Sequence, residues 1–243
     1  MTDALLVAIV LLAFTVEATL GFGATVVTVT LASFLAPIDA ILAAFVPLNL
    51  ALSTWLALRH RHHIAWPFLL TRVLPWMLLG LPLGLLALDA LDATLARRLF
   101  GASVVALAAL ELARLRRPTA APDAPLPPAA RAALLAAGGF VHGLFATGGP
   151  LAVYVTGREL PDKGRFRATL AVLWLTLNAL LVTSYALHGQ LTPTSARTTA
   201  LLAPALLGGL LLGEQLHRRL PPRAFRVGVF AALLAAGLVV LAR

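Results

Sequence analysis

Two short polar stretches, one in each half of the chain, interrupt otherwise apolar segments. The first carries Glu17 before Gly21-Phe-Gly23, and the second carries His142 before Thr147-Gly-Gly149. An ionisable side chain inside hydrocarbon costs about 2.5–3.5 kcal/mol even on a lenient insertion scale, which makes it a functional candidate. A glycine break at the same depth ends one helix and exposes backbone N–H groups at the start of the next, where the helix dipole favours an anion. The pattern predicts a small-anion site between the two breaks.

The two ionisable residues have alternative roles. Glu17 could carry a coupling proton or gate the site, or it could be a neutral carboxyl that caps free backbone groups of the glycine break beside it. His142 can release a proton near neutrality, or it could be a hydrogen-bonding group between helices. In the repeat register given below, Glu17 aligns with Gly143 and not with His142.

The expected binding groups are backbone amides of the two breaks, nearby hydroxyls and two asparagines. Asn49 and Asn178 are each the lone amide side chain of a long apolar segment. An amide in hydrocarbon must find a partner, which is either the substrate or a neighbouring helix. The predicted substrate-binding residues are Gly21, Gly23, Thr25, Asn49, Thr147, Gly148, Gly149 and Asn178.

The elements that position these residues must be membrane helices. The 243 residues are 60% hydrophobic and 12% charged, whereas soluble domains carry about 25% charged residues. Apolar runs long enough to cross about 30 Å of hydrocarbon recur along the chain, and none shows the short polar–apolar alternation of a β-barrel. We read the first run as a span, because it lacks the basic start of a signal peptide. The clearest runs are 4–20, 40–58, 66–88, 95–115, 168–187, 198–212 and 225–241.

The chain aligns with itself at an offset of 126 residues that grows to 129. Phe14 and Gly23 then fall on Phe140 and Gly149, and Asn49 falls on Asn178. Later, Pro75, Gly80 and Gly84 fall on Pro204, Gly209 and Gly213; for these four glycines we expect close helix packing. The alignment predicts two repeats, 1–115 and 129–243, joined by a Pro-rich linker at 116–128.

The positive-inside rule favours inverted repeats. If each broken segment (4–36 and 132–157) enters the membrane and returns, 15 of the 19 Lys and Arg residues lie inside, and only Arg97, Arg98, Arg197 and Arg243 lie outside. If each crosses once, the repeats are parallel and the best split is nine against ten. We therefore expect an all-α polytopic membrane protein with two inverted repeats of about four full spans each plus a broken or re-entrant segment, 8–10 membrane segments in all. Both termini are expected outside and the linker in the cytoplasm.

Other function classes lack their motifs. The chain has no Gly-x-Ser-Gly turn, His-Glu-x-x-His pair or Gly-x-x-x-x-Gly-Lys-Ser/Thr loop, and it has no cysteine. We read the run His60, His62 and His63 as a solvated basic loop at a membrane edge. The formal charge of +9 reflects Arg residues at segment ends, so nucleic acid is not an expected partner. No cofactor, metal or catalytic residue is expected. The expected partners are a small anion and the lipid bilayer, and a second copy in a homodimer is left open.

The sequence resembles the TauE/SafE sulfite exporter family. The residues that carry the resemblance are Gly-Phe-Gly-Ala-Thr-Val-Val at 21–27, Thr-Gly-Gly-Pro at 147–150, the duplicated halves and the central linker. The first motif of that family is richer in glycine than the one here. The resemblance implies a secondary transporter, an exporter of sulfite or an organosulfonate in the inner membrane. Alternating access, with proton coupling as an option, is the mechanism we expect. A passive anion channel and a non-transport assembly or anchoring factor are the alternatives.

Overall fold

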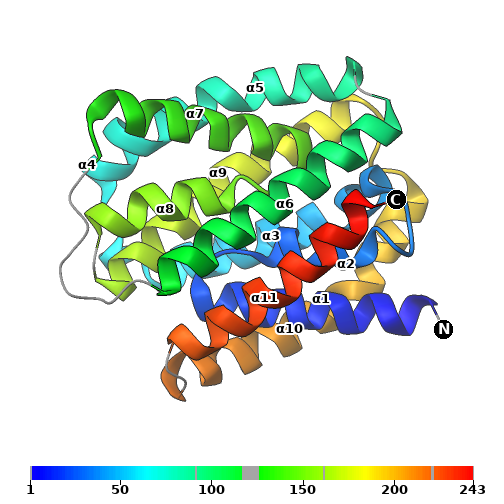
Figure 1. Ribbon diagram of the computed structural model, residues 1–243. Coiled ribbons are helices and arrows are strands. Elements are labelled where there is room, and N and C mark those ends of the chain that lie inside the picture. The colour runs from blue at the N-terminus through cyan, green and yellow to red at the C-terminus, as the bar shows by residue number, and fades with distance from the viewer. Residues whose placement is uncertain (1, 91, 117–125, 161, 220–221, 243) are drawn as a thin grey trace.

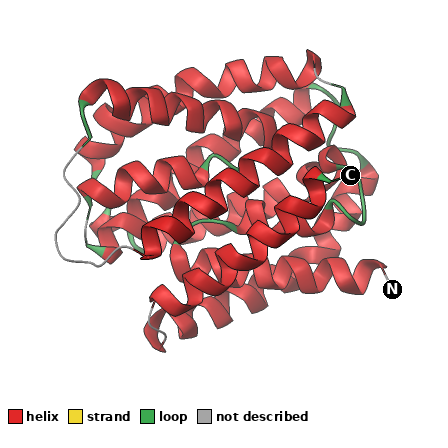
Figure 2. Ribbon diagram, in the orientation of Figure 1, coloured by secondary structure: helices red, strands yellow, loops and turns green. Residues whose placement is uncertain are grey.

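The computed structural model describes residues 2–90, 92–116, 126–160, 162–219 and 222–242. All regular structure in these ranges is helical (Figure 2), which confirms the all-α prediction. Most of the predicted linker, 117–125, lies outside the described residues. Five of the helices are long and apolar enough to span a membrane within the described part of the chain: they lie in Asp3–Leu20, Ile38–Arg59, Trp66–Ala87, Gly164–Leu187 and Pro193–His217.

Both halves have the same order of helices. In each, a long helix is followed by a break, a short helix and three further long helices. The first half contains α1 (Thr2–Leu20), α2 (Ala24–Ala32), α3 (Ile38–Arg59), the 3-10 turn Arg61–His63, α4 (Trp66–Phe68), a π-helical turn Leu69–Val73, α5 (Leu74–Ala90) and α6 (Ala93–Arg116). The second half contains α7 (Pro128–Phe145), α8 (Gly149–Glu159), α9 (Lys163–Leu187), α10 (Pro193–Arg219) and α11 (Pro222–Leu241).

The short helix α2 forms against its local preference. Its sequence, Ala-Thr-Val-Val-Thr-Val-Thr-Leu-Ala, is rich in β-branched residues that favour strands in water. Eight of its nine residues are buried, and a segment without access to water must satisfy its own backbone hydrogen bonds, which a helix does. The π-helical turn has a local cause: Pro75 lies two residues after its end at Val73, and proline has no N–H to continue a regular α-helical ladder.

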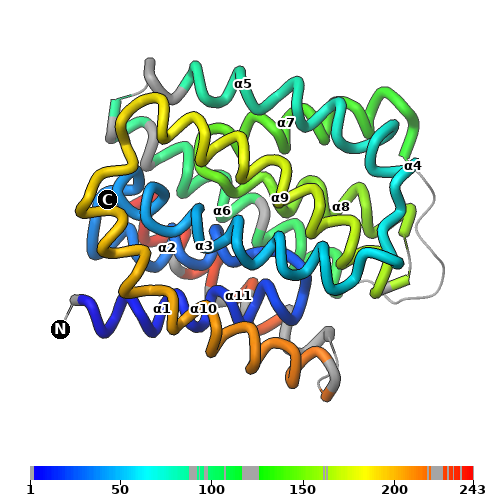
Figure 3. Tube along the Cα trace, turned by 180° about the vertical axis from the view of Figure 1, so that it is seen from behind, coloured from blue at the N-terminus to red at the C-terminus, as the bar shows by residue number. Residues whose placement is uncertain are grey.

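The two halves run in opposite senses through the molecule. In Figure 1, α1 runs from the N-terminal end toward the break and α2 returns toward the end where α1 began, whereas α7 and α8 enter and return at the end marked by α4. The reverse view agrees (Figure 3). We call these the terminal end, where both termini lie, and the α4 end. Each broken segment is therefore a re-entrant pair of helices, and the repeats are inverted.

The halves hold each other through crossed, glycine-lined contacts. A Cβ added to Gly80 of α5 would lie 1.9 Å from the carbonyl oxygen of Ala136 in α7, and one added to Gly84 would lie 2.1 Å from that of Phe140. In the equivalent pair, a Cβ on Gly209 or Gly213 of α10 would lie 2.6 or 2.4 Å from the nearest side-chain atom of α1. The third long helix of each half thus packs closely on the first helix of the other, as predicted for these glycines.

Candidate functional site: a polar cavity between the two helix breaks

The first break forms where the backbone turns left-handed. Gly21 has φ 85° and Gly23 has φ 108°, values that glycine adopts without steric cost. The N–H of Gly21 donates to the carbonyl of Glu17 at 2.6 Å and closes the last turn of α1. The carboxylate of Glu17 then reaches across the break, where Oε2 accepts a 3.0 Å hydrogen bond from the N–H of Ala24, the first residue of α2. Glu17 is 3% exposed.

The second break has the same construction with different residues. Ala146, with φ 52°, takes the left-handed position, and its N–H donates to the carbonyl of His142 at 2.7 Å. Glu17 and His142 therefore each lie four residues before the left-handed residue that ends their helix. The sequence register, which pairs Glu17 with Gly143, concealed this equivalence, because α7 ends one residue earlier than α1 in the repeat alignment.

Between the breaks lies a small polar cavity. Its lining includes eight of the ten predicted site residues: Glu17, Gly23, Thr25, Asn49, His142, Thr147, Gly149 and Asn178. The other two are close by but do not line it: Gly21 lies beneath the side chain of Arg167, and Gly148 packs against Gly138. The cavity volume is about 20 Å³, and roughly 10–15 Å³ is enough to hold one water molecule. The cavity is therefore small, and only a compact ligand suits it.

The cavity contains more hydrogen-bonding capacity than its own contacts use. Asn49 donates to Thr25 Oγ1 at 3.1 Å, but its Oδ1 has no hydrogen-bond partner among the described residues. The same holds for Glu17 Oε1, Thr147 Oγ1, both polar atoms of the Asn178 amide and both ring nitrogens of His142. Asn178 lies near the His142 ring without reaching standard hydrogen-bond geometry. Buried polar groups are normally paired. The unpaired polar atoms of this cavity are therefore available to bind a ligand.

Trp174 of α9 joins the two breaks. Its ring stacks on His142 with centroids 5.9 Å apart and planes 13° from parallel. Its Nε1–H donates to the carbonyl oxygen of Gly21 at 2.9 Å. One side chain thereby contacts the ionisable residue of one half and the broken backbone of the other. The sequence analysis did not select it, because a single Trp in an apolar run gives no sign of which way it faces.

The helix N-termini on the two sides of the cavity differ. The Glu17 carboxylate caps the N-terminus of α2, whereas no side chain among the described residues caps that of α8, which begins at Gly149 and has Pro150 in its first turn. An anion is stabilised at an uncapped N-terminus and repelled by an ionised carboxylate. The favourable place for an anion is therefore the side of the cavity formed by α8, His142 and Asn178.

Two comparisons with known proteins found relatives of this chain. The family model "Sulfite exporter TauE/SafE" matches residues 6–240. The chain belongs to this family. The family's description as sulfite exporters points to a membrane transporter and away from an enzyme. A curated relative, "Probable inner membrane transporter protein TsaS" of Comamonas testosteroni, is 30% identical over 101 residues, which is 41% of this chain and 42% of that protein. The aligned region thus spans less than half of the relative. No solved structure matches the chain.

In this TauE/SafE protein, a charged cluster lies between the break of the first half and the α4 end. The cluster consists of Arg167, Glu214, His60 and His217. Arg167, 5% exposed, packs on Gly21 and forms an ion pair with Glu214 of α10. His217 donates from Nδ1 to the carbonyl of Thr19 at 2.8 Å. Burial, followed by the positive charge of Arg167, lowers the pKa of His60. Of these four residues the sequence singled out only His60, as part of a solvated basic loop, whereas the structure shows all four grouped on this side of the break.

A second ion-pair group ties α8 to its neighbours at the α4 end. Glu159, the last residue of α8, accepts from Arg72 at 2.8 Å and from Arg131 at 3.0 Å. Arg72 belongs to the π-helical turn and Arg131 to α7. The half-exposed side chain of Arg72 lies at the α4 end.

We expect Glu214→Ala to destabilise this TauE/SafE protein more than the replacement of both partners of the ion pair, Arg167 and Glu214, does. Removing one partner of a buried pair costs about 3–5 kcal/mol because the other charge is left unpaired. Since Glu214 is 23% exposed at its side chain, the expected loss lies near the lower end. The double variant Arg167→Leu/Glu214→Leu should unfold at a higher temperature than Glu214→Ala in detergent. A double variant no more stable than the single one would contradict a role for the unpaired charge.

Proposed function

We propose that this protein carries a small anion, with sulfite or an organosulfonate as first candidates, across the inner membrane by alternating access between its two halves. The observation that supports this most strongly is the cavity shared by the two inverted breaks, with unpaired hydrogen-bonding atoms from both halves, unpaired donors from the second half and one carboxylate. The family description, sulfite exporter, supports the substrate class. The name of the relative, a probable inner membrane transporter protein, supports the location.

The anion would be held without a full positive charge. His142 N–H, the Asn178 amide and the Thr147 hydroxyl can donate to it, and the dipole of α8 points its positive end into the same space. Hydrogen bonds to a charged group contribute about 1.5–3 kcal/mol each, so a few such donors suffice. A site without Lys or Arg in its lining can release its guest, as a carrier must.

Glu17 would link the anion to a proton. An ionised Glu17 occupies the α2 N-terminus and repels an anion a few ångströms away, whereas a protonated Glu17 does not. Binding of the proton and of the anion then favour each other, and this linkage is reciprocal. A monovalent anion and a proton would cross together without net charge. Export by this route requires an anion gradient that exceeds the opposing proton gradient.

The charge distribution supports a cytoplasmic α4 end. Among the side chains that the structure describes, the terminal end carries Arg98 and Arg197, and the α4 end carries the remainder of the basic residues: Arg59, Arg61, Arg72, Arg114, Arg116, Arg131, Arg158, Arg165, Arg167 and Arg219. Under the positive-inside rule this proposal places both termini outside and the linker between α6 and α7 in the cytoplasm.

The test is flux in proteoliposomes of purified protein, with sulfite, sulfate, sulfoacetate, taurine and a control carboxylate, with and without a pH gradient. We expect saturable flux of a sulfur anion. Asn178→Ala should reduce it by about tenfold or more, the equivalent of one lost hydrogen bond to a charge. Asn49→Ala should cost less, because the Asn49 amide nitrogen is already bonded to Thr25. No flux of any anion by folded protein would overturn the proposal and favour the assembly-factor alternative.

A further inference from the structure

Arg167 lies on the face of α9 that leads to the polar cavity. Trp174 and Asn178 follow it by seven and eleven residues, which at 3.6 residues per turn puts all three on one face of the helix. Trp174 and Asn178 line the cavity. At a rise of 1.5 Å per residue, Arg167 lies about 16 Å from Asn178 along the helix, toward the α4 end. The function proposed above makes no use of this arginine.

The guanidinium of Arg167 has a partner that can be exchanged. Its side chain is 6% exposed, whereas that of Glu214, with which it is ion-paired, is 23% exposed and can turn toward water. Arg167 Nε has no hydrogen-bond partner among the described residues. A guanidinium fork binds two oxygens of one group at once, whether the group is a carboxylate or a tetrahedral oxyanion. The Glu214 carboxylate therefore occupies the place that an oxyanion would take.

The repeated fold does not require a charged pair at this position. At the offset of 129 residues that relates the later parts of the two halves, Arg167 pairs with Ile38 and Glu214 with Leu85. Ile38 and Leu85 are partly buried and pack against the hydrophobic core. Replacing a buried ion pair with apolar side chains is often neutral or stabilising. The charges on the α4 side of the first break are thus an addition that the inverted half does without.

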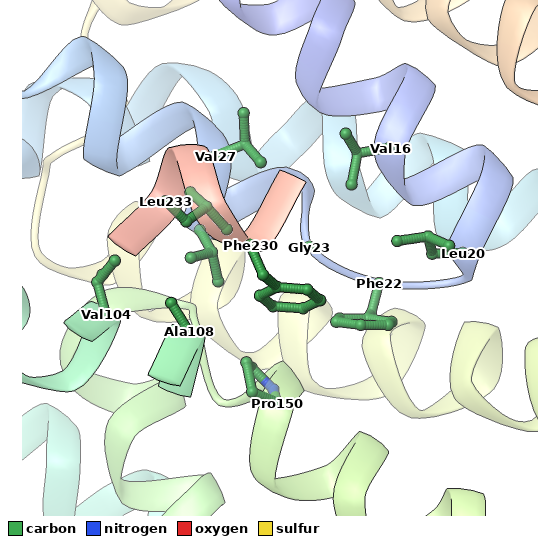
Figure 4. A pocket seen from close by; sticks show the side chains of 11 residues that line it. Val16, Leu20, Phe22, Gly23, Val27, Val104, Ala108, Pro150, Phe230 and Leu233 are labelled. Atoms are coloured by element: carbon green, nitrogen blue, oxygen red, sulfur yellow. The ribbon is translucent and has the colours of Figure 1, made fainter. Parts of the chain in front are cut away.

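Another side of the first break, toward α6 and α11, is apolar. Figure 4 shows the side chains there, among them Phe22, Val104, Pro150 and Phe230. The rings of Phe22 and Phe230 have centroids 6.1 Å apart. The cavity between these side chains is about 10 Å³, against roughly 10–15 Å³ for one water molecule. At the first break, an anion finds a charged partner on the side of Arg167 and not on this one.

We propose that Arg167 is an entry subsite for the transported anion, whose oxygens replace the Glu214 carboxylate on the guanidinium before the anion moves along α9 to the polar cavity. This inference rests on the carrier function proposed above and adds a binding residue to it. Exchange keeps the buried charge of Arg167 paired throughout, because Glu214 returns when the anion leaves. The free Nε–H supplies a further donor while the anion is bound.

The test compares the capture of anion by variants of the pair. Capture is kcat/KM for labelled sulfite, or for whichever anion of the panel above moves instead, in proteoliposomes of the full-length protein. Glu214→Gln keeps a side-chain oxygen for Arg167 without the charge, so an anion displaces it more easily and capture should rise several-fold. Arg167→Gln/Glu214→Gln leaves no charge unpaired, and its capture should fall by about tenfold or more below that of Glu214→Gln, the equivalent of one lost hydrogen bond to a charge. Arg167→Lys/Glu214→Gln keeps the charge without the fork and should recover only part of this loss.

The matched control is Glu159→Gln, which removes a carboxylate from the other ion-pair group at the α4 end, where Glu159 binds Arg72 and Arg131. It should leave capture unchanged. A pair that only closed the path would ease flux whenever it is broken, so the Glu214 variant and the double Gln variant would then rise together. Equal capture by those two variants, or an equal rise with Glu159→Gln, would show that the subsite is wrong while the carrier function stands. If folded wild-type protein carries no anion of the panel, both fail.

Discussion

Glu17→Gln is expected to remove the proton dependence of anion flux while leaving the protein folded. The side-chain carbonyl of Gln can still accept the hydrogen bond that Ala24 gives to Glu17 at 3.0 Å, so the break keeps its cap and loses only the titrating proton. Couplings between sites are typically worth 1–3 kcal/mol, or about 5–150-fold in affinity. We expect a stimulation of that size by acid in wild-type protein and none in the variant, measured as sulfite flux against pH in proteoliposomes.

The matched variant Glu17→Ala separates the two roles of the carboxylate. It removes both proton and cap, and loss of a helix N-cap costs about 1 kcal/mol. Glu17→Ala should therefore unfold at a lower temperature than Glu17→Gln. If the flux of Glu17→Gln keeps the pH profile of wild-type protein, Glu17 is a structural cap alone and the proton must be carried elsewhere, with His142 as the next residue to replace.

Gly80→Ala is expected to prevent stable pairing of α5 with α7. The new methyl group would lie 1.9 Å from the carbonyl oxygen of Ala136 and 2.7 Å from the backbone nitrogen of Phe140. These are backbone atoms, so relief requires the two helices to separate. Overpacking of this kind costs about 1–3 kcal/mol and occasionally more, and we expect the upper part of that range. The measurement is the yield of monodisperse protein and its unfolding temperature in detergent.

Gly228→Ala is the control for this prediction. Gly228 is helical in α11 and exposed, and an added Cβ meets no atom within 4 Å. Replacing an open helical glycine with alanine should stabilise the protein slightly, by up to about 1 kcal/mol. Equal stability of the Gly80 and Gly228 variants would show that the α5–α7 contact can widen freely, contrary to the crossed packing described here.

Much of the architecture could be predicted from the sequence because the membrane restricts the alternatives. The lengths of the apolar runs indicated the helices. The repeat alignment paired Gly80 with Gly209 and Asn49 with Asn178 as equivalent positions. The charge bias favoured inverted halves, and the helices enter and return in the senses that this requires. These signals are long-ranged along the chain and tolerate errors of a residue or two at helix ends.

Details of the candidate site depend on helix phase, which a nearly all-apolar sequence does not reveal. The one-residue difference in where α1 and α7 end hid the equivalence of Glu17 and His142. Trp174 and Arg167 face the breaks from α9. In the sequence, however, Trp174 lies in an apolar run and Arg167 lies in the basic start of a helix. Their contacts with Gly21 required the fold. The binding roles of the site residues stay predictions.

The crossed contacts between the halves also bear on how the chain is made. Thr19 of α1 donates to the carbonyl of Gly213 in α10, 194 residues later. When the ribosome has completed the first half, α5 still lacks its partner α7 and α1 still lacks its partner α10. The cavity beside Glu17 is then incomplete, because the helices of the second half are not yet made. Helices of the first half must wait in the bilayer, or be held by the insertion machinery, until the second half emerges. A chain that stops after the first half therefore lacks the side of the polar cavity next to Glu17 that α7, α8 and α9 supply.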